Sequence, residues 1–154
     1  MNVDPNLKAL GKLVGEWTTE ATHPMVPGVI VHGSASIEWL EGGRFLIHRA
    51  RTDRPDFPDS ISIIGYMDQD RAESDGSSDP APLRMHYFDQ RGVFRIFETS
   101  IDATAWKFWR EAPGFSQQFT GTFSNDGNVI VGQSQLRRDD VHWVDDLAMT
   151  YRRR

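Results

Sequence analysis

The sequence predicts an all-β fold, an antiparallel up-and-down β-barrel of about ten strands with one short N-terminal helix capping one end. Three observations support this prediction. Short runs of β-forming residues follow one another through most of the chain. Turn residues rather than helices separate these runs, so neighbouring strands must be antiparallel. The length of 154 residues suits a single domain, residues 1–154, and closure into a barrel would leave no exposed sheet edge.

The one predicted helix covers residues 4–14. Asp4 can cap its first turn, and Pro5 suits the first helical position because that residue needs no backbone N–H. Gly15 can end the helix in the left-handed conformation. The residues expected to form its apolar stripe are Leu7, Leu10 and Val14.

The predicted barrel occupies residues 16–152. Gly42 and Gly43 mark one tight turn, and the stretch Asn125-Asp126-Gly127-Asn128 marks another. The expected strands are 16–22, 29–40, 43–52, 60–68, 82–88, 92–101, 104–110, 115–124, 128–137 and 141–152. Residues 68–82, DQDRAESDGSSDPAP, are polar and without periodicity, which predicts a mobile loop between two strands.

Composition limits the classes of function. The net charge of −5 argues against a nucleic-acid partner. Without cysteine, the protein has neither disulfides nor thiolate metal ligands. The absence of a signal-like or membrane-spanning apolar segment predicts a cytoplasmic protein that does not insert into membranes. The 5 Trp, 9 Phe and 3 Tyr residues suffice for a core and for the lining of a cavity.

A helix followed by Gly15-x-Trp17 and an antiparallel meander resembles the calycin superfamily of lipocalins, fatty-acid-binding proteins and nitrobindins. The chain is most similar to the bacterial DUF1579-type proteins, a family of unknown function. The resemblance implies that Trp17 closes one barrel end and that an arginine of the last strand, Arg152 or Arg153, covers it. The matching motifs are Leu10-x-x-Leu13-x-Gly15-x-Trp17, Trp39-Leu40-x-Gly42-Gly43-Arg44-Phe45-Leu46, Ile64-Gly65-Tyr66, His86-Tyr87-Phe88-Asp89, Phe119-x-Gly121-x-Phe123-x-x-Asp126-Gly127 and Thr150-Tyr151-x-Arg153.

The resemblance to nitrobindins also raises haem as a possible cofactor. Those proteins bind haem through a histidine near the C-terminus, a role that would fall to His142. The segment after Trp17 lacks the further glycine pattern of nitrobindins, so we expect no cofactor and keep haem as an alternative. No histidine spacing predicts another metal site.

Polar residues within apolar strand faces point to a ligand site. Alternation places Glu98 with Phe94 and Ile96 on one strand face, and Arg95 with Phe97 on the other. The sequence does not determine which face points inward, and a shift of one residue exchanges the two. The residues we expect to line or orient a ligand are Trp39, His48, His86, Glu98 and Trp109.

The preferred function is non-catalytic binding of a small, largely apolar molecule inside the barrel. One alternative is an enzyme that uses His48 or His86 as general base with Glu98 as its partner. Another is a homodimeric structural module that pairs through outward aromatic residues such as Trp109. The sequence contains no nucleophile elbow or phosphate-binding loop that would favour a particular reaction.

Overall fold

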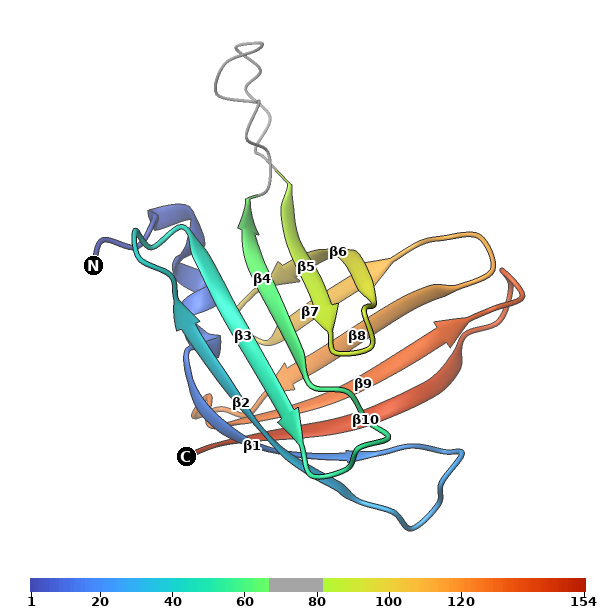
Figure 1. Cartoon of the computed structure of the whole chain (residues 1–154). Helices are drawn as coiled ribbons and strands as arrows, with labels where there is room; N and C mark the ends of the chain where they lie inside the picture. The colour runs from blue at the N-terminus through green and yellow to red at the C-terminus, as the bar shows by residue number, and fades with distance from the viewer. Residues whose placement is uncertain (67–81) are drawn as a thin grey trace.

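A computed structural model describes residues 1–66 and 82–154 of the chain, and in these ranges it forms a closed ten-stranded barrel (Figure 1). Each strand pairs antiparallel with its neighbours in the sequence, and β1 pairs with β10 to close the ring. The elements are η1 (Pro5–Leu13), β1 (Gly15–Thr22), β2 (Val31–Trp39), β3 (Phe45–Thr52), β4 (Ser60–Tyr66), β5 (Leu83–Asp89), β6 (Phe94–Ile101), β7 (Ala105–Arg110), β8 (Ser116–Phe123), β9 (Val129–Arg137) and β10 (Val144–Arg153).

The predicted fold class is therefore confirmed. All ten strands fall where the sequence predicts them, with ends that differ by three residues or fewer. The glycines of the predicted turns explain this agreement, since Gly42, Gly43 and Gly127 all have positive φ. Positions 68–81 of the predicted mobile loop lie outside the described residues.

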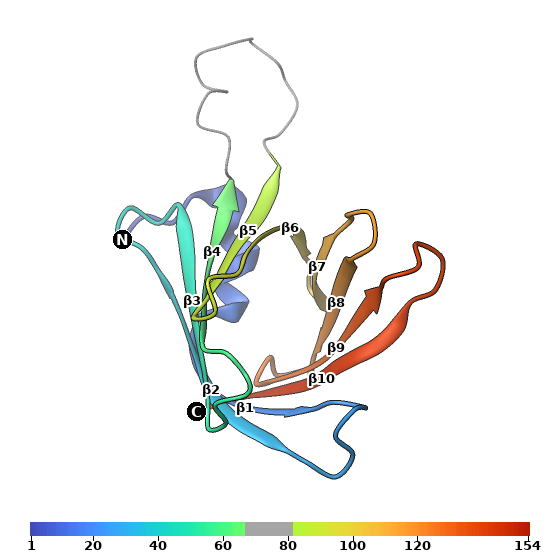
Figure 2. The same cartoon turned by 45° about the vertical axis from the view of Figure 1, so that its right-hand side comes forward.

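The barrel has two different ends. Consecutive strands run in opposite directions, so the turns β2–β3, β6–β7 and β8–β9 share one end, which η1 covers. The Lys12 ammonium donates to the Ala103 carbonyl at 2.6 Å, and the Asp4 amide donates to the Gly43 carbonyl at 3.1 Å. We call this the closed end. The other end, which we call the open end, carries the turns β1–β2, β3–β4, β5–β6, β7–β8 and β9–β10. Figure 2 shows the barrel turned to another side.

The helix differs from the prediction in its type and in its buried face. It is a 3₁₀ helix, whose three residues per turn bring every third side chain to the same side. Its buried residues are accordingly Leu7, Leu10 and Leu13, whereas Val14 is only half-buried. Asp4 caps the helix as predicted, because its carboxylate accepts a hydrogen bond from the Asn6 amide at 2.9 Å.

Trp17 and Arg153 close the barrel beneath this helix. Trp17 is fully buried, and its indole N–H donates to the Leu13 carbonyl at 2.9 Å. The guanidinium carbon of Arg153 lies 4.1 Å from the centre of the indole ring, within the range of a cation–π interaction. Arg153 also donates to the carbonyls of Val14 and Lys12, the latter at 2.9 Å. Arg153 therefore ties the last strand to the end of the helix.

Gly15 leaves the space that this closure requires. Its φ of +144° is unfavourable for residues with a side chain, and a Cβ placed there would lie 2.5 Å from Nη1 of Arg153. The glycine two residues before Trp17 therefore admits the arginine that covers the indole.

The closed half of the barrel is filled by one apolar cluster. Inward side chains from most strands meet the helix there, and nearly all of them are inaccessible to solvent. The fully buried members with large side chains are Leu7, Leu10, Leu13, Trp17, Ile37, Leu46, Ile64, Trp106 and Ile130.

Candidate functional site

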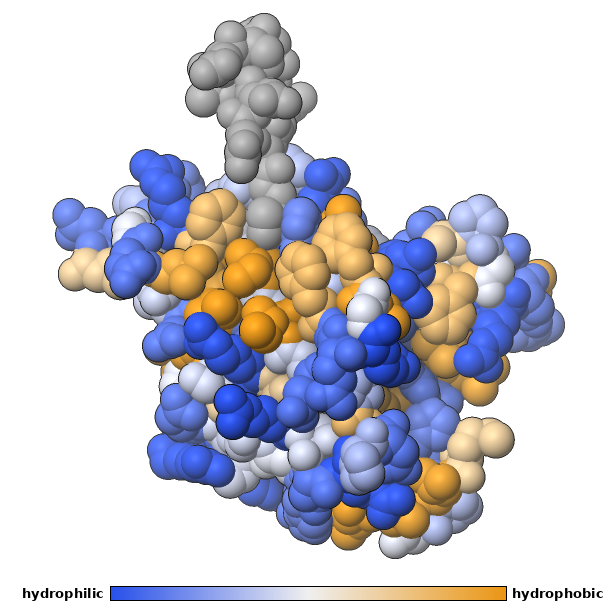
Figure 3. Space-filling model, viewed as in Figure 1, coloured by the Kyte–Doolittle hydropathy of each residue, from blue (hydrophilic) through white to orange (hydrophobic). Residues whose placement is uncertain are grey.

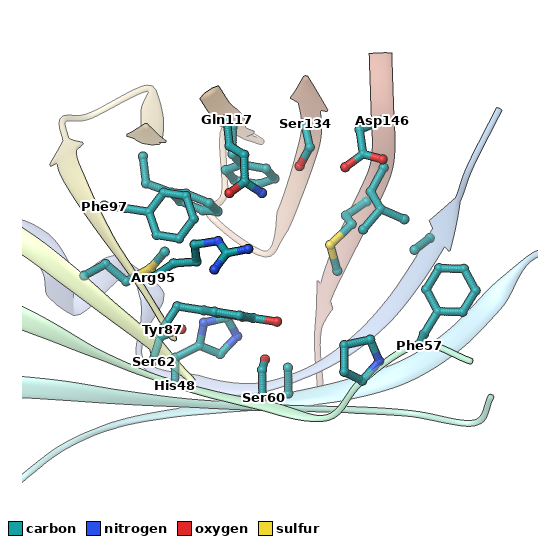
Figure 4. A pocket seen from close by; sticks show the side chains of 18 of the residues that line it. His48, Phe57, Ser60, Ser62, Tyr87, Arg95, Phe97, Gln117, Ser134 and Asp146 are labelled. Atoms are coloured by element: carbon teal, nitrogen blue, oxygen red, sulfur yellow. The ribbon is translucent and has the colours of Figure 1, made fainter. Parts of the chain in front are cut away.

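A cavity of about 370 Å³ lies inside the barrel toward the open end (Figure 4). Residues of the open-end loops border it, including Phe57 from β3–β4, Arg91 from β5–β6 and Phe115 from β7–β8. Its wall is rich in aromatic side chains. The aromatic residues that come from the strands are Tyr87, Phe97, Trp106, Phe108, Phe119 and Tyr151.

Polar side chains cross this aromatic wall in a single row. Strand pairing places His48 of β3 opposite Ser62 of β4, Ser62 opposite Tyr87 of β5, and Tyr87 opposite Arg95 of β6. All four line the cavity. Because residues paired in register project from the same level of a sheet, the row forms a polar band on one side of the cavity.

His48 is the most buried member of this row. Only 8% of the residue is exposed, and its Nε2 has no hydrogen-bond partner among the described residues. Burial lowers the pKa of His48 from 6.5 to about 4, so the imidazole is neutral at neutral pH. Its ring centre lies 6.1 Å from that of Trp106 and 6.3 Å from that of Tyr151. The imidazole therefore presents an unpaired nitrogen close to the rings of Trp106 and Tyr151.

Gln117 of β8 adds a second buried polar atom without a partner. Its Oε1 accepts no hydrogen bond from any residue in 1–66 or 82–154, and its side chain lines the cavity. Buried polar atoms in folded proteins are almost always hydrogen bonded. Two of the three unpartnered buried side-chain atoms in residues 1–66 and 82–154 therefore lie on the lining of this one cavity, and the third is Nε of Arg137.

Tyr87 belongs to a hydrogen-bonded chain that runs toward the open end. Its hydroxyl lies 2.8 Å from Oδ2 of Asp89, and Nη2 of Arg91 lies 2.7 Å from the same oxygen. The hydrogen bond from Arg91 is the main cause that holds the pKa of Asp89 well below its usual range. Burial, together with Asp89, raises the pKa of the Tyr87 hydroxyl. The chain thus fixes the Tyr87 ring in the cavity wall in its neutral form.

Of the five site residues predicted from the sequence, His48 lines the cavity. Trp39 shares the inward register through its pairing with Leu46, but it packs against the core at the closed end. His86, Glu98 and Trp109 face away from the cavity, because Arg95 and Phe97 occupy the inward positions of β6. The site described here therefore contains only one of the five.

The outward residues have partners on the barrel surface. Glu98 forms an ion pair with Arg84 at 3.2 Å, and the His86 ring packs edge-on against Phe94 at 5.9 Å. Trp109, paired in register with Glu98, is 37% exposed. Most of the cavity lining was not predicted, including four polar side chains: Ser62, Tyr87, Arg95 and Gln117.

His142, the residue on which the haem alternative depends, lies in the loop between β9 and β10. Its Nδ1 is 2.7 Å from Oδ2 of Asp139, and most of the side chain is exposed to solvent. His142 does not line the cavity, so its position does not fit that of an axial ligand to a haem inside the barrel. Within residues 1–66 and 82–154, no three or more acidic or histidine side chains are grouped so that they could hold a metal ion. The same ranges hold no helix long and apolar enough to cross a membrane.

An apolar surface lies on the outside of the barrel, over β4, β5 and β6. Four of its residues are between 42% and 49% exposed: Ile61, Phe88, Phe94 and Ile96. The rings of Phe88 and Phe94 are stacked with their centres 5.1 Å apart. Figure 3 shows apolar residues gathered on the side of the molecule that carries β3, β4 and β5.

Comparison with known proteins agrees with the predicted resemblance. A family model described as "Protein of unknown function (DUF1579)" matches residues 4–74. Among solved structures, the chain is similar to the crystal structure of Rv2717c from M. tuberculosis, with a TM-score of 0.66 and 14% sequence identity over 99% of each chain. That likeness shows a shared fold. No curated protein matches the sequence significantly. The similarity to DUF1579 proteins is therefore confirmed, and the calycin-like barrel agrees with it.

Proposed function

We propose that the protein binds a small, largely apolar molecule in the barrel cavity and does not transform it chemically. The observation that carries this proposal is a cavity of about 370 Å³ with an aromatic wall and two unpartnered buried polar atoms. Small-molecule sites in proteins typically have this make-up, with volumes of about 300–1,000 Å³, mostly apolar walls and a few polar groups that orient the ligand.

The aromatic wall supplies the affinity in this proposal. An apolar ligand that enters the cavity leaves water and contacts rings such as Trp106, Phe108 and Phe119. Burial of apolar surface contributes about 2.5 kcal/mol for each 100 Å² removed from water. The ring centres of Phe108 and Phe119 lie 4.6 Å apart in a stacked arrangement, so this part of the wall is already organised before a ligand binds.

The positions of His48, His86 and Glu98 do not support the enzyme alternative. The enzyme alternative requires a histidine and Glu98 within hydrogen-bonding distance inside the barrel. His48 faces the cavity, whereas Glu98 lies on the outer surface beside Arg84. His86 and Glu98 share the outer surface, outside the cavity. The predicted pairing of a histidine with Glu98 is therefore not formed inside the cavity.

The proposal can be tested by blocking the cavity. Ser60 of β4 lines the cavity, and its neighbour Ile61 points outward and is 42% exposed. A tryptophan at each position adds the same group to the inner or the outer side of one strand. We expect Ser60→Trp to reduce the affinity for 2-naphthylmethanol, a neutral aromatic alcohol, by at least about tenfold, which corresponds to about 1.4 kcal/mol. Ile61→Trp should bind like the unmodified protein in isothermal titration calorimetry.

A thermal-shift screen of fatty acids, retinoids, flavins, haem and 2-naphthylmethanol widens the test. A ligand of the cavity must raise the melting temperature, because it binds only the folded state. The proposal is wrong if no compound in the screen stabilises the protein. It is also wrong if Ser60→Trp and Ile61→Trp bind every stabilising compound equally well.

A further inference from the structure

We propose that the cavity selects an amphipathic anion, a molecule with an apolar body and one carboxylate or similar oxyanion, and that Arg95 binds the anionic group. This inference rests on the proposed function, because it specifies the class of ligand for the same site. Four features carry it: the position of Arg95, the pairing of the other charges, the available hydrogen-bond donors and the shape of the lining.

Arg95 is a cation inside the barrel. Its inward position on β6 follows from its pairing with Tyr87, and Figure 4 shows its side chain extending into the cavity. Its guanidinium donates to the carbonyl of Phe94 at 3.2 Å and lies 5.8 Å from the ring centre of Phe115. Both are weak partners for a full charge.

The other charged groups of the lining have partners of opposite charge or hydrogen-bond partners. Arg91 forms an ion pair with Asp89 at 2.7 Å, and Asp146 lies within hydrogen-bonding distance of Nε2 of His23. Arg95 forms no ion pair with any residue in 1–66 or 82–154. A charge that is partly removed from water and unpaired is unfavourable, and an anionic ligand would relieve this cost.

The location of this cation contrasts with the charge of the whole protein. The chain has a net charge of −5, so its average field repels anions. A carboxylate would therefore be held by the local arrangement around Arg95 and not by general attraction to the surface. Arginine suits this role because its planar guanidinium can donate two parallel hydrogen bonds to a carboxylate.

Further donors lie at the same level of the barrel. The register row from Arg95 continues through Tyr87 to the Ser62 hydroxyl and the His48 imidazole. Ser62 and His48 are both buried, and Nε2 of His48 has no hydrogen-bond partner in residues 1–66 and 82–154. Hydroxyl and imidazole groups can both donate to an oxyanion. The row thus offers a headgroup site that runs across one side of the cavity.

The apolar body of such a ligand would lie toward the closed end. One step along the strands from the polar row, the inward residues are Ile64, Met85 and Phe97. Met85 and Phe97 line the cavity, and Trp106 and Phe119 border it as well. The site therefore has a polar level and an apolar level, which is the arrangement an amphipathic molecule requires.

The test compares two probes that share one aromatic body. 2-Naphthoate carries a carboxylate at pH 7.5, and 2-naphthylmethanol carries a neutral hydroxyl. Calorimetry with the unmodified protein should show that 2-naphthoate binds at least about tenfold more tightly, as a charge-assisted hydrogen bond predicts. If the alcohol binds as tightly as the carboxylate or more tightly, the inference is overturned. This comparison requires no variant.

Two variants assign the preference to Arg95. Arg95→Met should weaken binding of 2-naphthoate by about tenfold or more and leave binding of the alcohol within about twofold. Arg51→Met removes the same charge from an exposed outward position on β3, so it should bind both probes like the unmodified protein. Binding of the alcohol to Arg95→Met also shows that the variant is folded. If Arg95→Met does not fold, Arg95→Lys takes its place. This variant should lose part of the affinity for 2-naphthoate and keep the affinity for the alcohol.

The outcomes separate this inference from the proposed function. If the alcohol binds in the cavity and 2-naphthoate gains nothing from Arg95, the cavity is a binding site and the anion inference is wrong. An equal loss of both probes in Arg95→Met also overturns it, because the arginine would then act on the shape of the cavity. If neither probe binds and the screen finds no stabilising compound, both proposals are wrong.

Discussion

At the closed end of the barrel, Trp17 is fully buried and its indole N–H is hydrogen bonded, whereas in the cavity toward the open end the buried His48 has a nitrogen without a partner among the described residues. Arg153 at the closed end likewise donates to several carbonyls, while the side chain of Arg95 at the open end forms one hydrogen bond with the residues that the structure describes. Both ends are rich in aromatic residues. The difference lies in whether the polar groups among them are paired.

This comparison separates stability from ligand binding. Packed side chains and paired polar groups stabilise the folded state, and unpaired buried polar atoms reduce its stability. We infer that the closed end provides most of the stability of the barrel, and that the open end retains features which a ligand would complete. Substitutions at the closed end should therefore lower the free energy of unfolding strongly. Substitutions that remove an unpaired polar atom at the open end should leave this free energy unchanged or raise it slightly.

The largest effect should come from Trp17→Ala. Removal of a fully buried aromatic side chain leaves a cavity in the core and should lower the free energy of unfolding by about 3–5 kcal/mol. Urea unfolding followed by circular dichroism measures this loss. Trp109→Ala, which truncates a tryptophan that is 37% exposed, is the control and should cost less than half as much. Equal costs would contradict the special role of the closed end.

Acid should destabilise the protein through His48. Its pKa is about 4 in the folded state against 6.5 in the unfolded state, so between these values the unfolded chain binds more protons. Stability is thus greatest above about pH 6.5 and falls as the pH approaches 4, by about 2–3 kcal/mol at pH 4.5.

The variant His48→Phe checks the origin of this pH dependence. Phenylalanine does not titrate, so urea unfolding of the variant should lose most of its slope between pH 6.5 and 4.5. His32→Asn, at an exposed position, is the control and should keep the full slope. An unchanged slope in His48→Phe would show that other groups cause the acid sensitivity.

A smaller loss is expected for Arg153→Met. The variant removes a cation–π contact worth about 0.5–2 kcal/mol and leaves carbonyls of the helix end without their donor. We expect a total loss of about 2 kcal/mol in the free energy of unfolding. Arg152→Met removes the neighbouring, exposed arginine and should change stability by less than about 0.5 kcal/mol. If the two variants were equally stable, Arg153 would not be part of the closure.

The smallest effect should come from Gln117→Leu at the open end. Leucine is similar in size and removes a buried oxygen that accepts no hydrogen bond from the described part of the chain, so stability should stay constant or rise by up to about 1 kcal/mol. Thermal unfolding in the absence of ligand measures this change. A loss greater than about 1 kcal/mol would mean that Gln117 stabilises the empty barrel, contrary to the comparison of the two ends.

The sequence predicts the closed end better than the open end for a physical reason. Turn glycines such as Gly42 and Gly127 require special backbone angles, so they mark strand ends without knowledge of the fold. Gly15 and Trp17 lie close together in the chain, and the family resemblance adds a role for an arginine of the last strand. Local sequence does not distinguish the 3₁₀ form of the helix from an α-helix, because Leu13 and Val14 both fit an apolar stripe.

The site depends on register, which local sequence does not determine. Alternation correctly separates Glu98 from Arg95, but both faces of β6 carry aromatic residues, so hydrophobicity does not identify the inward one. His48 is flanked by Leu46 and Ala50 on the same face, and this apolar context marks it as inward. The same test does not select Arg95, because Phe94 and Ile96 make the opposite face of β6 as apolar as the face of Phe97.

The most direct test of the binding claim uses methionine methyl groups as reporters in NMR spectra. Met85 and Met149 line the cavity, whereas Met1 and Met25 are exposed and lie outside it. On titration with 2-naphthylmethanol, ring-current shifts should appear for Met85 and Met149 and be absent for Met1 and Met25. A saturable titration that leaves Met85 and Met149 unshifted would place the ligand outside the barrel and contradict the account.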